Sequence, residues 1–143
     1  MPFRFLDHTG DTAVELAAPS EAELLREGTR ALCAILIDLE AGPAPRRIEA
    51  REVALDAEDG EALLVDYLNE LVFLFDHEAF LGYDLEGIDV RLDPPSILRA
   101  TVWGERFDPQ RHVFLTEVKA ATFHDLSIRR TDEGVSAVVV FDL

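Results

Sequence analysis

The apolar run over residues 135–141 constrains the fold of this chain more than any other segment. Its sequence, Val-Ser-Ala-Val-Val-Val-Phe, is typical of a strand inside a sheet, so we expect residues 135–142 to be buried. Asp142 and Leu143 follow directly, and such a strand carries the Asp142 side chain and the Leu143 carboxylate with it. Carboxylates at the end of a buried strand need a cation or hydrogen-bond donors nearby to stay charged. The end of the chain is therefore a candidate metal site.

Two helices and several short strands are expected in the rest of the chain. Helical spacing of apolar residues predicts helices over about 21–39 and 61–76, capped by Ser20 and by Asp59 or Glu58. Strands are predicted over 11–17, 48–55, 88–92, 97–105, 117–129 and 135–142, with a polar turn at 82–83 and a hairpin turn at 131–134. This order indicates an α+β fold, in which two amphipathic helices pack on a mostly antiparallel sheet.

Size and charge limit the function classes. The 143 residues predict a single domain over 1–143, and the formal charge of −16 disfavours direct binding of nucleic acid. The same charge suits a cation or a basic protein partner.

Cys33 is the only cysteine, so a reducing compartment is expected, and its place in the first helix predicts a core position. No signal-peptide-like segment or bilayer-length apolar run is present, and we expect a cytoplasmic protein without membrane contact.

The first candidate site is the sequence Asp-His-Thr-Gly-Asp at 7–11. Asp7 and Asp11 stand four residues apart around Gly10 and can converge on one cation across a tight turn. The more frequent interpretation of such a pattern is a polar turn whose acids accept hydrogen bonds from the loop backbone. If the strand over 11–17 pairs with the last strand, Asp11 and Asp142 come together with the Leu143 carboxylate. An all-oxygen site of this kind suits Ca²⁺ or Mg²⁺ rather than Zn²⁺.

The last candidate site is the segment over 117–124, Glu-Val-Lys-Ala-Ala-Thr-Phe-His. On a strand, Glu117 and Lys119 would share one face and Thr122 and His124 the other. A surface ion pair is the common interpretation, and a cation directed at phosphate or at a partner's carboxylate is the alternative. A single histidine on a strand is more often a structural hydrogen-bonding group than a catalyst. No phosphate-binding loop, nucleophile elbow or zinc spacing occurs in the chain.

Taken together, these segments resemble the archease family along essentially the whole chain. The resemblance rests on Asp-His-Thr-Gly-Asp at 7–11, the amphipathic helix over 63–76, Trp-Gly-Glu at 103–105, the segment over 117–124 and Asp-Leu at 142–143. Each motif alone is weak, but their order and spacing are specific. Two positions depart from the family pattern: Gly10 stands where the family has alanine, and Leu143 where it ends in isoleucine. Neither change removes a ligand.

The resemblance implies an accessory protein rather than an independent enzyme. Archeases assist the GTP-dependent RNA ligase of tRNA splicing, promoting guanylylation of the ligase histidine and repeated turnover. By resemblance, Asp11, Asp142 and Leu143 would hold a divalent metal, most often calcium, with magnesium or manganese as alternatives. Asp7 would support that site from outside the ligand shell. Lys119, with Glu117 and His124, would contact or activate the ligase.

Two other functions stay open. A small metal-dependent phosphoester hydrolase could use Asp11, Asp142 and His124, but it would need a general base within reach of a metal-bound water. A general protein-binding chaperone would rest on the amphipathic helices and the acidity alone.

Overall fold

A computed structural model describes residues 3–6, 11–122 and 127–143. From the N-terminus, the elements are β1 (Phe3–Leu6), β2 (Asp11–Ala18), α1 (Glu21–Leu36), β3 (Glu49–Ala57), α2 (Gly60–Glu78), β4 (Phe80–Arg91), β5 (Ser96–Arg106), β6 (Ala120–Thr122), β7 (Ile128–Thr131) and β8 (Gly134–Asp142). Within the described residues, no helix is both long enough and apolar enough to span a membrane.

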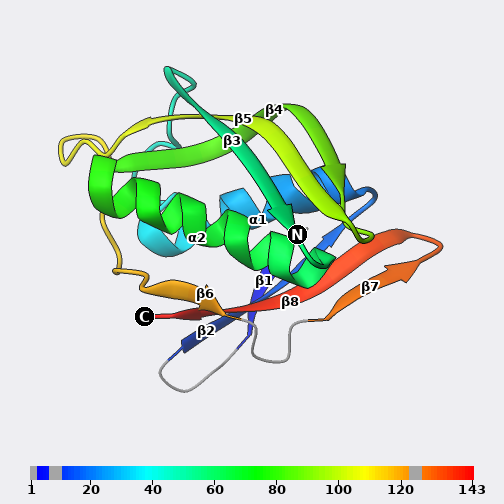
Figure 1. The fold of residues 1–143 in the computed structure, drawn as a ribbon. Coiled ribbons are helices and arrows are strands. Elements are labelled where there is room, and N and C mark those ends of the chain that lie inside the picture. The colour runs from blue at the N-terminus through cyan, green and yellow to red at the C-terminus, as the bar shows by residue number, and fades with distance from the viewer. Residues whose placement is uncertain (1–2, 7–10, 123–126) are drawn as a thin grey trace.

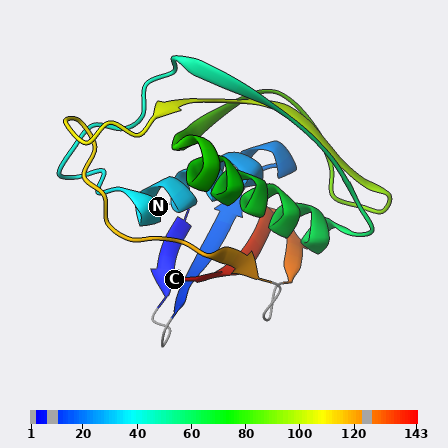
Figure 2. The same cartoon turned by 60° about the vertical axis from the view of Figure 1, so that its left-hand side comes forward.

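Two antiparallel sheets enclose the two helices. One sheet has the order β1-β2-β8-β6, with β7 also paired to β8, and the other has the order β3-β5-β4. Figures 1 and 2 show α1 and α2 as a layer between the sheets. The α+β architecture with antiparallel sheets is therefore confirmed, and the helices are covered on two sides instead of one.

The last strand organises the larger sheet. β8 pairs with β2 along one edge and with β6 and β7 along the other. Its alternate residues Val135, Ala137, Val139 and Phe141 belong to the main hydrophobic core, as do Val14 and Leu16 of β2. The opposite, outer face of this sheet carries Asp142, whose strand position alternates with these core residues.

Both helices begin at the predicted caps. The Ser20 hydroxyl accepts a hydrogen bond from the Glu23 N–H at 3.2 Å, and the Asp59 carboxylate accepts one from the Ala62 N–H at 2.8 Å. α1 ends at Leu36, earlier than predicted, because Ile37 is extended and forms an isolated β-bridge with Phe114. Cys33 is buried in the core, as its helical position predicted.

Two local predictions were wrong, and one strand was not predicted. Residues 117–129 do not form one strand: the separate strands β6 and β7 lie along the same edge of β8, and residues 117–119 belong to no strand. Gly82 and Tyr83 lie within β4, where the pairing register shifts, so a bulge replaces the predicted turn. The sequence analysis also missed β1, which pairs with β2 at the sheet edge.

Candidate functional site

Asp11 and Asp142 are direct neighbours across two strands. The antiparallel pairing of β2 with β8 sets them opposite each other, as the pairing of the first predicted strand with the last one required. Directly opposite residues place their side chains on the same face, with Cβ atoms roughly 5 Å apart. Both residues are half-buried. Two like charges at this separation repel each other, so a cation between them would stabilise the sheet end.

The segment leading into β6 meets the same strand end from the other side. The Lys119 N–H donates a hydrogen bond to the Asp142 carbonyl at 2.8 Å, and Ala120 is the register partner of Asp142. The backbone of Asp142 is thus held between β2 and β6. Leu143 follows with its side chain packed against the hydrophobic core, which fixes the position of its main-chain oxygens.

Asn69 of α2 anchors β6 in a way that the sequence analysis did not anticipate. Its side-chain oxygen accepts a hydrogen bond from the Ala121 N–H at 2.8 Å, and its amide nitrogen donates one to the Ala121 carbonyl at 3.1 Å. The Asn69 amide therefore pairs with β6 as a neighbouring strand would, on the edge away from β8. No local sequence pattern indicates this contact, because Asn69 and Ala121 lie 52 residues apart in the chain.

Lys119 and Glu117 are exposed and lie outside any strand. The prediction that they share a strand face is therefore wrong, because regular pairing with β8 begins only at Ala120. Lys119 is also the single lysine in the sequence, where every other cationic side chain apart from histidine is an arginine. Asp7 and His124, the other predicted site residues, lie outside the described residues. Their roles stay predictions.

The donor chemistry of this strand end fits a hard divalent cation. Asp11 and Asp142 offer carboxylate oxygens, Leu143 offers main-chain oxygens, and Ca²⁺ and Mg²⁺ prefer oxygen ligands. Across the described ranges, however, no group of three or more His, Cys, Asp or Glu side chains is placed to hold a metal. The residues brought together here therefore supply part of a coordination shell, to which further oxygens would have to be added.

A second titratable cluster surrounds Glu105, which is only 4% exposed. Burial alone would raise the pKa of the Glu105 carboxyl. The hydrogen bond from the Arg46 N–H and the guanidinium groups of Arg46 and Arg111 outweigh this effect of burial, so the pKa of Glu105 is lowered. His112 lies beside Glu105, with Nε2 3.5 Å from Oε2, and its Nδ1 accepts a hydrogen bond from the Asp108 N–H. This cluster joins two loops to the end of β5.

The glycine before Glu105 has a packing role. A Cβ atom at Gly104 would lie 1.8 Å from the Leu81 carbonyl oxygen, so β4 could not approach β5 this closely with any other residue. The Trp-Gly-Glu motif thus combines a close strand contact with a buried ion-pair cluster. Both features support the fold and lie apart from the pair of aspartates.

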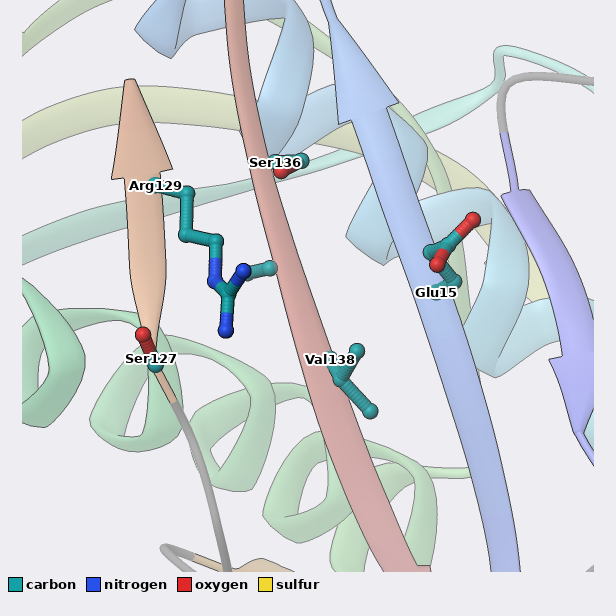
Figure 3. A pocket seen from close by; sticks show the side chains of 6 residues that line it. Glu15, Ser127, Arg129, Ser136 and Val138 are labelled. Carbon is teal, nitrogen blue, oxygen red and sulfur yellow. The ribbon is translucent and has the colours of Figure 1, made fainter. Parts of the chain in front are cut away.

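The outer face of the larger sheet also carries a separate hollow of about 370 Å³, lined by Glu15, Ser127, Arg129, Ser136, Ala137 and Val138. Figure 3 shows Arg129 reaching from β7 toward β8, with Glu15 on β2 across that strand. Glu15 is already paired with Arg4 at 2.9 Å. Neither Asp11 nor Asp142 lines this hollow.

Known proteins resemble this chain over its full length. The model of the archease protein family matches residues 3–143. Protein archease of Methanopyrus kandleri is 34% identical over 145 residues, covering 100% of both chains. Protein archease of Pyrococcus furiosus is 33% identical over 131 residues, covering 90% of this chain and 88% of the relative.

Solved structures agree with this fold. The solution structure of Methanobacterium thermoautotrophicum protein 1598 has a TM-score of 0.75 at 29% identity and covers 99% of both chains. A crystal structure from Thermotoga maritima, described as an archease and possible chaperone, has a TM-score of 0.62 at 23% identity, covering 96% of this chain and 94% of that one. The family match and the relatives of at least 30% identity establish that the chain belongs to the archease family.

Proposed function

We propose that this protein is a metal-binding accessory protein that activates the GTP-dependent RNA ligase of tRNA splicing. In this role it promotes guanylylation of the ligase histidine and allows repeated turnover, and it does not itself join or cleave RNA. The observation that carries the proposal is the register pairing of Asp11 with Asp142 beside Lys119. The ligase is proposed as the partner because the sequence motifs resemble those of archeases, and membership in that family supports an accessory role.

Asp11, Asp142 and the main-chain oxygens of Leu143 would hold the metal, with Ca²⁺ the first choice and Mg²⁺ or Mn²⁺ as alternatives. When bound, such a cation polarises phosphate oxygens and offsets charge that develops on them. The protein's own contribution is positional. β2 and β8 hold the two carboxylates opposite each other, and the packed side chain of Leu143 orients the oxygens of the same residue.

Lys119 would act on the partner and not on the metal. Its backbone is tied to Asp142, while its exposed side chain is available to a carboxylate or phosphate of the docked ligase. Lys119 thus lies next to the proposed cation. Its protonated ammonium group cannot coordinate a metal ion, because it has no free acceptor electron pair. The acidic surface as a whole, with a formal charge of −16, favours a ligase face rich in arginine and lysine.

The proposal is tested by comparing metal binding with activation in three variants. Asp11→Ala and Asp142→Ala should abolish calcium binding in calorimetric titrations and lower ligase guanylylation about tenfold or more, because a cation at phosphate is worth several kcal/mol. Lys119→Ala should bind calcium normally and still fail to activate. Arg91→Ala, which removes an exposed cation of β4, is the control for a change in net charge. Unchanged calcium affinity in all variants would refute the site, and full activation by Lys119→Ala would refute its role.

A further inference from the structure

Three consecutive large apolar residues are exposed on the segment that precedes Lys119. Val113, Phe114 and Leu115 are 42%, 49% and 52% exposed. Single exposed apolar side chains are common on protein surfaces, but a consecutive run of them usually has a binding role. Phe5 of β1 is also 49% exposed and lines the same hollow as Leu115.

The segment that carries these residues, 113–115, is fixed and not a loose loop. The Val113 carbonyl accepts a hydrogen bond from the Asp38 N–H at 2.8 Å, and the Leu115 N–H donates one to the Leu36 carbonyl at 2.8 Å. The Phe114 ring stacks on Phe75 at a centroid distance of 6.4 Å. A binding surface held in place in this way loses little conformational entropy when a partner docks.

The hollow beside this segment is large enough for an apolar side chain of a partner. Its volume is about 380 Å³, and it opens between β1, β2, α1 and the segment 113–115. Phe5 and Leu115 contribute apolar walls, Ala34 and Ile35 of α1 line it as well, and the hollow reaches the start of β2 at Asp11. It therefore adjoins the paired aspartates, while the segment continues through residues 116–118 to Lys119 beside Asp142.

We propose that Phe5, Leu115 and this hollow form the surface on which the partner protein docks. The partner would insert one apolar side chain flanked by arginine or lysine residues. This inference rests on the proposed function, because docking here would bring the partner's phosphate-binding centre to Asp11, Asp142 and Lys119. A second copy of the chain is disfavoured as the occupant, since both copies carry a charge of −16 and an aspartate at the hollow.

The test separates docking from activation by titrating the protein into a fixed amount of ligase. Leu115→Ser and Phe5→Ser should raise the concentration needed for half-maximal guanylylation at least tenfold, while the plateau at saturation stays at the wild-type level. Ile48→Ser is the matched control, because Ile48 is 54% exposed but lies at the start of the other sheet. It should leave the half-maximal concentration unchanged. Thermal unfolding of each variant shows whether the fold is retained.

Direct binding to the ligase, measured by calorimetry, distinguishes the possible failures. If the wild-type protein binds the ligase without activating it, the proposed function is wrong, and the docking surface is judged by whether Leu115→Ser weakens binding. Equal affinities of the wild type, Leu115→Ser and Phe5→Ser would overturn the docking surface alone. Absence of any binding overturns both proposals. Light scattering should give a monomer, and a dimer that Leu115→Ser dissociates would assign the surface to a second copy instead.

Discussion

Replacing Asp142 by asparagine should change the stability of the protein in opposite directions with and without calcium. Asp142 and Asp11 face each other across β8 and β2, and without a cation their charges repel. Asparagine keeps the shape of the side chain and removes its charge. In a chelator, Asp142→Asn should therefore be more stable than the wild type. In calcium the order should reverse, because the variant lacks one of the proposed ligands.

The size of each effect follows from the geometry. Two unit charges about 4–5 Å apart repel by about 1 kcal/mol with the screening of water, and by up to about 4 kcal/mol near a protein surface. Both aspartates keep contact with water at the strand ends, and water screens their charges, so we take the lower figure. Calcium at about one hundred times its dissociation constant stabilises a folded protein by about 2.7 kcal/mol. The variant should thus be about 1 kcal/mol more stable in chelator and about 2 kcal/mol less stable in calcium.

Urea unfolding in chelator and in calcium measures both differences. Glu58→Gln is a suitable control, because it removes an exposed acid before α2 that lies in neither strand of the pair. Its free energy of unfolding should rise with calcium as much as that of the wild type. If Asp142→Asn is less stable than the wild type in both solutions by the same amount, the carboxylates are not a cation site and the reasoning fails.

Three further predictions concern the surroundings of the site. Asn69→Ala should lower the free energy of unfolding by about 1–3 kcal/mol in urea titrations, because it leaves the Ala121 N–H and carbonyl without their partner; a change below 0.3 kcal/mol would contradict this role. The lowered pKa of Glu105 contributes stability above its unfolded value of 4.5, and this contribution is lost as the pH falls through the folded pKa. Glu105→Gln should therefore be less stable than the wild type at pH 7, and its free energy of unfolding should fall less steeply between about pH 5 and pH 3. Parallel curves of unfolding free energy against pH for the two proteins would refute the assignment. Burial raises the pKa of the Cys33 thiol to about 12, so a thiol reagent at pH 8 should label it only after unfolding, as absorbance would show.

The helices show how far sequence pattern predicts this fold. Both caps, Ser20 and Asp59, lie where the sequence predicted them, because capping depends on residues within a few positions. Sequence pattern did not predict that the two helices lie between two sheets. Buried residues cover more than one face of α2, from Leu63 and Leu64 to Val72 and Leu74, because the helix contacts both sheets. An amphipathic pattern alone suggests one apolar face.

The candidate site was predictable only in part. The apolar run before Asp142 and the short strand after Asp11 predicted strands whose pairing brings the two acids together, and this pairing is confirmed. The conformation around Lys119 depends on contacts that join distant parts of the chain. The bond from Lys119 to Asp142 and the clamp of Asn69 on Ala121 span 23 and 52 residues, and no local pattern encodes them. For the same reason the segment over 117–129 was mistaken for a continuous strand.

The role as a ligase activator is tested by measuring the guanylylated fraction of a tRNA-splicing RNA ligase, with GTP and calcium, in the presence and absence of this protein. Substoichiometric amounts of the protein should speed histidine guanylylation and let each ligase molecule seal many RNA ends, and the protein alone should modify no RNA. If the ligase is guanylylated equally fast, and turns over equally often, with and without the protein, the protein is not an activator of this ligase.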